Sequence, residues 1–159
     1  MDLAELSDRE AIRQLLAAYN INGDRGRVDL LADTFAEDGV IEFSGERTQG
    51  RAAIAARLGG GSRGGEGGKS SRLTVTRHHL ATSLVEIDGD SADARTYFMV
   101  HTDIGPDHHG VYVDRLIRTP QGWRFAHRQV RIDWQAEGSL FGPLHVRGQR
   151  PGSERDGRK

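Results

Sequence analysis

The chain has 159 residues, of which 36% are hydrophobic and 28% are charged, and it contains 21 glycines and no cysteine. This size and composition are typical of one globular domain. The 22 basic and 23 acidic residues nearly balance, which argues against general attraction to nucleic acids or anionic membranes. No apolar run is long enough to span a membrane, the acidic N-terminus is unlike a signal peptide, and missing cysteines exclude disulfides, so we expect a cytoplasmic protein.

Residues 1–58 predict three helices and a short strand. Ser7 opens a Ser-x-x-Glu capping box, and apolar residues recur at helical spacing from Ile12 to Tyr19, so a helix should begin at Ser7 and end near Asn22. The later segments are expected as a helix over residues 28–35, a strand over 40–43 and a helix over 50–58.

Tyr19 lies on the apolar face of the first predicted helix, and Asp24 follows directly after its predicted end. Considered alone, Tyr19 is as consistent with a core tyrosine as with a functional one. Asp24 considered alone is more typical of a turn or of a helix cap.

Two segments predict little regular structure. Residues 59–71, with the sequence GGGSRGGEGGKSS, offer no apolar side chains to bury, so we expect a flexible loop that could act as a lid. Its single RGG and GKS triplets do not complete an RNA-binding tract or a phosphate loop. Residues 145–159 are polar and rich in glycine, which predicts a disordered tail after a single domain over residues 1–144.

The remainder predicts an antiparallel meander of four strands, with a strong hairpin signal at Asp88-Gly89. The expected strands are residues 72–87, 91–103, 110–119 and 123–134. The last strand carries large apolar side chains on both faces, for example Trp123 on one and Ile132 on the other. A sheet that is apolar on both sides needs two covers, so we expect helices on one face and a second copy of the chain on the other, giving a homodimer or a higher homo-oligomer through the sheet.

Adjacent histidines stand in the middle of the longest predicted strand. Side chains alternate along a strand, so His78 and His79 must face opposite sides of the sheet. His79 shares its predicted face with the small residues Ala81 and Ser83, which would leave room for a ligand. The pattern therefore favours His79 as the functional histidine and leaves His78 as a partly exposed or interface residue.

A metal site is a weaker interpretation. Asp107, His108 and His109, or His78 with His101, could be drawn as ligands, but their spacing matches no known metal motif. The stretch GPDHHG is more typical of a hairpin loop, so we expect no bound metal.

Three segments resemble the SnoaL-like branch of the nuclear transport factor 2-like superfamily, over residues 6–134. They are the opening DREAIRQLLAAYNINGDRGRVDLLADTFAEDGVIEF, the HHL of the central strand, and the closing GVYVDRLIRTPQGWRFAHRQVRIDW. The resemblance implies an α+β fold, a cone in which three N-terminal helices pack on a curved antiparallel sheet. It leaves the function open, because this scaffold hosts dehydratases, isomerases, cyclases and binding modules.

The resemblance also implies site residues. The bile-acid dehydratases, scytalone dehydratase and the hexachlorocyclohexane dehydrochlorinase are similar in using an aspartate after the first helix and a histidine on the central strand, which correspond to Asp24 and His79. The dehydrochlorinase type implies a role for Arg128 on the last strand. The bile-acid type implies one for Tyr19.

The walls of the expected pocket follow from alternation and from the resemblance together. His101, the nearest counterpart of a second histidine in scytalone dehydratase, then falls on the face opposite the pocket. The expected substrate-binding residues are Phe98, Val100, Val130, Ile132 and Trp134. Such walls suit a compact, largely apolar ring compound of steroid, terpenoid or polyketide type.

A histidine that is oriented by an aspartate can abstract a proton near neutral pH. We therefore predict a cofactor-independent lyase that eliminates water, with His79 as general base oriented by Asp24. Tyr19 and Arg128 would stabilise the developing charge. The alternatives are an isomerase or polyketide cyclase with the same residues, and a non-catalytic dimer that binds a small molecule.

Overall fold

The computed structural model describes residues 2–60 and 72–147. Helices and strands are mixed in an α+β fold, and the elements follow in this order: α1 (Leu3–Asp24), α2 (Val28–Ala32), β1 (Phe35–Phe43), β2 (Glu46–Gln49), α3 (Arg51–Gly60), β3 (Thr76–Asp88), β4 (Ser91–Thr102), β5 (Gly105–Thr119) and β6 (Gly122–Gln135).

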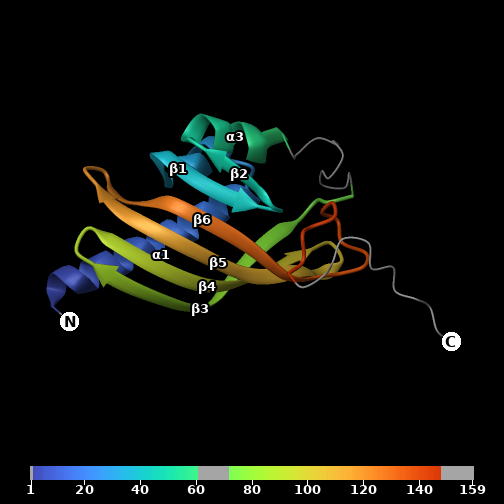
Figure 1. Cartoon of the computed structure of the whole chain (residues 1–159). Coiled ribbons are helices and arrows are strands. Elements are labelled where there is room, and N and C mark those ends of the chain that lie inside the picture. The colour runs from blue at the N-terminus through green and yellow to red at the C-terminus, as the bar shows by residue number, and fades with distance from the viewer. Residues whose placement is uncertain (1, 61–71, 148–159) are drawn as a thin grey trace.

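The strands form one curved, unclosed sheet in the order β2-β1-β6-β5-β4-β3. Neighbouring strands are antiparallel except β1 and β6, which run parallel. Figure 1 shows α1 lying along one face of this sheet, with α3 against β1 and β2 at one end. We call the face toward α1 the inner face and the opposite one the outer face. The α+β fold that the sequence predicts is confirmed.

Helix α1 is longer than predicted at both ends. It begins at Leu3 because the side chain of Asp2 accepts a hydrogen bond from the backbone nitrogen of Glu5 at 2.8 Å, which caps the helix. The predicted start at Ser7 is therefore wrong. The helix also continues through Gly23 to Asp24, which places the last carboxylate on the helix end itself.

The next elements also differ from the prediction. Helix α2 ends at Ala32, because the carbonyl of Thr34 accepts from the backbone nitrogen of Phe125 at 2.9 Å and draws the chain into the sheet. Strand β1 therefore starts at Phe35, and β2 was not predicted. Strand β5 starts at Gly105, so the GPDHHG stretch is strand and the hairpin-loop interpretation is wrong.

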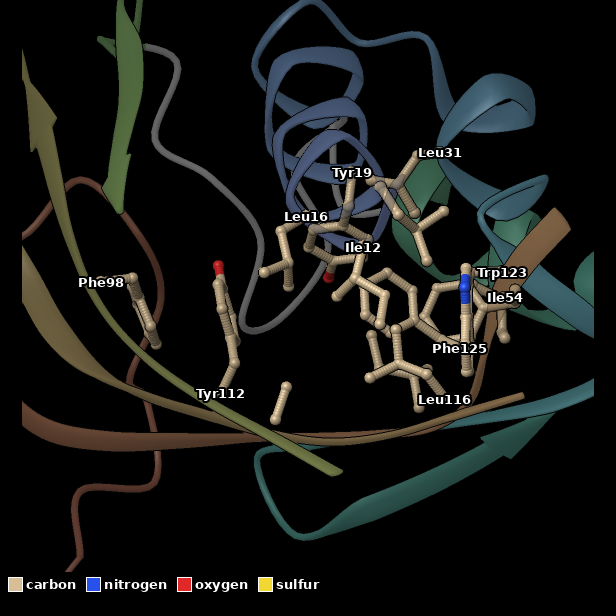
Figure 2. Packing of buried hydrophobic residues seen from close by; sticks show 14 of the residues in the cluster. Ile12, Leu16, Tyr19, Leu31, Ile54, Phe98, Tyr112, Leu116, Trp123 and Phe125 are labelled. Carbon is tan, nitrogen blue, oxygen red and sulfur yellow. The ribbon is translucent and has the colours of Figure 1, made fainter. Parts of the chain in front are cut away.

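The core lies between α1 and the inner face, as Figure 2 shows. The ring of Tyr19 meets those of Phe35, Tyr112 and Phe125 edge-on, with centroids 5.9–6.0 Å apart. The apolar face predicted for the first helix is confirmed, since Ile12 and its neighbours are buried. Each large apolar side chain buried in this way contributes about 1.5–3 kcal/mol to stability.

Four β-bulges decide which side chains face inward. In β3 there is one extra residue between Leu80 and Ser83, in β5 an extra residue lies at Asp107, and in β6 one lies at Ala126 and another just before Trp134. Because of the bulge at Ala126, Trp123 and Ile132 are both buried in the core, so the prediction that they face opposite sides of the sheet is wrong. A bulge shifts the alternation by one, so every side chain beyond it changes face relative to a regular strand.

The predicted loop over residues 59–71 and the predicted tail over 145–159 lie almost entirely outside the described residues. Residues 59–60 belong to α3, and residues 145–147 run beside β6, where Val146 pairs with Ile132. Within the described part of the chain, none of the helices is long and apolar enough to cross a membrane.

Candidate active site

Asp24 and His78 form a closely bonded pair at the end of α1. One carboxylate oxygen of Asp24 lies 2.5 Å from Nδ1 of His78, and the other accepts from the backbone nitrogen of His78 at 2.9 Å. Their side chains are 9% and 20% exposed. Because a carboxylate can only accept, Nδ1 carries the proton, which makes Nε2 the nitrogen that can take a proton from a substrate.

His79 does not take part in this pair, and the prediction that it pairs with Asp24 is wrong. His79 is exposed on the outer face, where its ring meets that of His101 at a centroid distance of 4.9 Å. The bulge in β3 is the cause. Without it His79 would share a face with Val85 and Ile87, which pack against the core; with it, His78 does.

The predicted walls Phe98 and Val100 lie on the inner face beside His78. Val100 is directly opposite His78 in the sheet, and the ring of Phe98 is 6.3 Å from the imidazole. Both are buried. Phe98 also stacks on Tyr112 with centroids 4.3 Å apart, as Figure 2 shows.

Tyr112 and Asn20 are site residues that sequence reasoning missed. The hydroxyl of Tyr112 donates to the side-chain oxygen of Asn20 at 3.0 Å, and both residues are buried. Asn20 directly follows Tyr19 on α1, so a buried polar residue on the helix face that carries Tyr19 was the available signal. No comparable signal in the sequence pointed to Tyr112, which lies on the distant strand β5.

Arg128 is completely buried and forms a two-point ion pair with Asp114, with nitrogen-to-oxygen distances of 2.8 and 2.7 Å. Its guanidinium carbon lies 4.2 Å from the ring centre of Tyr19, 4.1 Å from that of Tyr112 and 4.0 Å from that of Phe125. The arginine is thus enclosed by three aromatic rings, two of which belong to tyrosines.

Burial governs the ionisation of the tyrosines. Desolvation raises the pKa of Tyr19 and raises that of Tyr112 well above its ordinary value, although the positive charge of Arg128 lowers both. Both hydroxyls therefore keep their protons at neutral pH. For Arg128, burial alone would lower the pKa, but the adjacent carboxylate of Asp114 reverses this and raises it, so the guanidinium stays charged.

The three remaining residues predicted to line the pocket do not all lie on the same face of the sheet. Ile132 is buried on the inner face, and Val130 pairs with Tyr112 on that same face. Trp134 is 43% exposed on the outer face and stacks on His109, with centroids 5.6 Å apart. The prediction that Trp134 lines the pocket is wrong, because the bulge just before it reverses its direction.

A pocket of about 500 Å³ lies between the β1–β2 turn, β6 and residues 145–147. Its apolar part is formed by Phe43, Val130 and Ile132, and its polar rim includes Arg47 and Arg147. Asp24 and His78 are not among its lining residues. Tyr112 joins the two regions, since it pairs with Val130 and stacks on Phe98 beside His78.

The side chains considered as metal ligands do not gather into a cluster in the described part of the chain. Within residues 2–60 and 72–147 there is no group of three or more histidine, aspartate or glutamate side chains placed to hold a metal ion. His108 is buried on the inner face, whereas its neighbour His109 stacks on Trp134 on the outer face.

Comparisons with known proteins agree with this architecture. A model of the SnoaL-like domain matches residues 4–129. The uncharacterized protein Rv2910c of Mycobacterium tuberculosis is 29% identical over 140 residues, which cover 80% of this chain and 87% of that protein.

Two solved structures are 30% identical to this chain. Rv3472, a protein of unknown function from Mycobacterium tuberculosis that was solved as an aspartate-to-asparagine variant, gives a TM-score of 0.70 over 82% of this chain and 74% of that one. A nuclear transport factor 2-like protein with a cystatin-like fold from Novosphingobium aromaticivorans gives 0.68 over 86% and 87%.

Proposed function

Because the chain belongs to the SnoaL-like domain family of the nuclear transport factor 2-like superfamily, we propose that it is a cofactor-independent lyase that eliminates water from a compact, largely apolar ring compound. Members of this superfamily are often cofactor-free dehydratases, isomerases or cyclases. The observation that carries the proposal is the contact of 2.5 Å between Asp24 and Nδ1 of His78.

His78 takes the role of general base. Its Nε2 accepts a proton from a carbon next to a carbonyl, and Asp24 stabilises the imidazolium that forms. The electrons of the broken C–H bond move to the carbonyl oxygen, and their return expels a hydroxyl group from the next carbon. The imidazolium gives its proton to that hydroxyl, so one water molecule leaves and His78 is neutral again.

Tyr19 is the proposed donor for the developing negative charge on the carbonyl oxygen. Its high pKa keeps it protonated, and a donor of this kind typically contributes about 10²-fold or more to the rate. Arg128 is a positioning residue in this scheme. Its charge lies against the face of the Tyr19 ring, which favours transfer of negative charge toward the phenol.

The substrate class follows from the apolar surroundings. Phe98 and Val100 stand beside His78, and Val130 and Ile132 line the pocket farther along the inner face. These apolar walls would hold the ring system, and the polar groups beside them, His78 and the rim residues Arg47 and Arg147, would bind its substituents, so a ring compound with one carbonyl and one hydroxyl suits this face.

A direct test uses 3-hydroxy-1-tetralone, a two-ring β-hydroxyketone that becomes fluorescent 1-naphthol when it loses water. Wild-type protein should accelerate naphthol formation, and His78→Ala should remove the acceleration by at least about 10²-fold. His79→Ala is the matched control on the outer face and should behave as wild type. Equal rates for wild type and His78→Ala would refute the role of His78.

A homodimer through the outer face is the second part of this proposal. Tyr97, Met99 and Trp134 are exposed there, and His79, Met99, His109 and Trp134 form one row across four strands. Covering these side chains with a second copy would remove the exposed parts of Tyr97, Met99 and Trp134 from water.

A further inference from the structure

A second histidine–aspartate pair lies inside the protein, on β5. Nδ1 of His108 is 2.7 Å from a carboxylate oxygen of Asp107, and both side chains are almost completely buried. Consecutive residues of a regular strand face opposite sides. Here the extra residue in β5 lets Asp107 and His108 both be buried.

The carboxylate of Asp107 is held from several directions. It accepts from the hydroxyl of Ser139 at 2.7 Å, from the backbone nitrogen of Leu140 at 2.9 Å and from the hydroxyl of Thr102 at 3.3 Å. Burial alone would raise the pKa of Asp107, but the hydrogen bonds from His108, Leu140 and Ser139 lower it. Asp107 is therefore ionised and fixed, and it holds the imidazole of His108 in one orientation.

His108 shares a row of the sheet with His78. Val100 pairs with His78 on one side and with His108 on the other. The backbones of the two histidines are therefore two strand spacings apart, or about 10 Å across the sheet. The imidazole of each lies 6.3 Å from the ring of Phe98, so both histidines border the same aromatic side chain on the inner face.

His108 is suited to accept a hydrogen bond and not to donate a proton. Burial lowers its pKa, and the nearby carboxylate of Asp107 only partly opposes this, so the ring is neutral at pH 7. With the Nδ1 proton directed to Asp107, Nε2 is the nitrogen that can accept, and the rings of Phe98 and Phe141 meet the imidazole edge-on at centroid distances of 6.3 and 4.7 Å. Such a nitrogen binds a hydroxyl hydrogen.

We propose that His108 is the second imidazole of the site and that it binds a hydroxyl group of the substrate through Nε2, at the end of the ring system away from the carbon that His78 deprotonates. The substrate is then a hydroxylated ring compound that spans the two histidines beside Phe98. This inference rests on the proposed function for the identity of the site, but it makes a claim about binding that does not require turnover.

The test compares two ring probes of nearly equal shape, 1-naphthol and 1-fluoronaphthalene, by isothermal titration calorimetry. Fluorine replaces the hydroxyl but cannot donate, so wild-type protein should bind the naphthol about tenfold more tightly. His108→Asn keeps a donor toward Asp107 but has no acceptor at the position of Nε2, and it should lose this preference. His79→Ala is the matched control, because His79 is exposed on the outer face, and it should keep the preference.

Two results of the titrations would overturn the role of His108 in binding. No preference in wild-type protein, or a full preference in a folded His108→Asn variant, would overturn the proposal. Nitrogen-15 spectra of the wild-type histidine side chains give a measurement that does not depend on any variant: 1-naphthol should shift the Nε2 resonance of His108, and an unmoved resonance would also overturn it. Loss of the tetralone reaction with the naphthol preference intact would reject the lyase alone.

Discussion

Asp24 holds His78 at two points, although 54 residues separate them in the chain: one carboxylate oxygen bonds the backbone nitrogen and the other bonds the imidazole. Because the backbone and the ring of the same residue are fixed by one group, the ring orientation relative to β3 is fixed as well. The end of α1 thereby sets the direction of a side chain on the sheet.

Asp24→Asn should disturb the tautomer of the His78 ring and leave the fold intact. An asparagine oxygen can still accept from the backbone nitrogen of His78, but its amide nitrogen cannot accept from Nδ1–H, so the required tautomer is no longer favoured. We expect kcat for the tetralone reaction to fall by about 10²- to 10⁴-fold, with the melting temperature close to wild type. Steady-state kinetics and thermal unfolding on the same sample provide the measurement. A wild-type kcat in Asp24→Asn would contradict the assignment.

The buried pair of Arg128 and Asp114 should dominate the stability of the core. Asp114→Asn leaves the guanidinium without a counter-charge in a region closed to water, and breaking a buried pair in this way costs about 3–5 kcal/mol. Urea unfolding followed by tryptophan fluorescence measures the change. Asp93→Asn removes the partner of Arg115 in an exposed pair at 3.8 Å and should change stability by less than about 1 kcal/mol.

Asp8 should make stability sensitive to acid. Its carboxylate accepts from Arg118 at 2.6 and 2.7 Å and from the indole nitrogen of Trp123 at 3.0 Å, which ties α1 to β5 and β6. The hydrogen bonds from Arg118 and then Trp123 lower the pKa of Asp8 to about 2. The unfolded chain binds the proton more tightly, since an unperturbed aspartate has a pKa of about 3.9.

Asp8 stabilises the folded protein only while its carboxylate is ionised. The stabilisation by ionised Asp8 is fully present above about pH 4 and is lost as the pH falls toward 2. Asp8→Asn should lower the melting temperature at pH 7, and the difference from wild type should shrink as the pH drops through this window. Scanning calorimetry between pH 7 and pH 2 tests this, and a difference that stays constant would count against the contact.

The proposed homodimer predicts a difference between two exposed apolar positions. Met99→Asp puts a charge in the centre of the outer face and should shift the protein from dimer to monomer in sedimentation velocity runs. Leu30→Asp is the control, because Leu30 is also exposed but lies on α2, away from the outer face. Equal sedimentation of wild type and Met99→Asp as monomers would exclude a dimer through this face.

The sequence by itself determined the fold class and the order of the main elements, and it led to an aspartate and a histidine as the candidate pair. The helical spacing from Ile12 to Tyr19 and the strong turn at Asp88-Gly89 are local signals, and local signals suffice to place a helix face or a hairpin. The family resemblance placed Asp24 near a histidine of β3. Phe98 and Val100 were also assigned to the correct face.

Only the tertiary structure decided which histidine faces Asp24 and where Trp134 points. Each answer depends on a single extra residue in a strand, and a bulge is defined by the pairing with the neighbouring strand, which the sequence of one strand does not contain. The same holds for Asp107 and His108, which alternation would put on opposite faces. Alternation is a local rule, whereas register is a property of two strands, and that difference is the physical reason the sequence alone favoured His79 and the folded sheet presents His78.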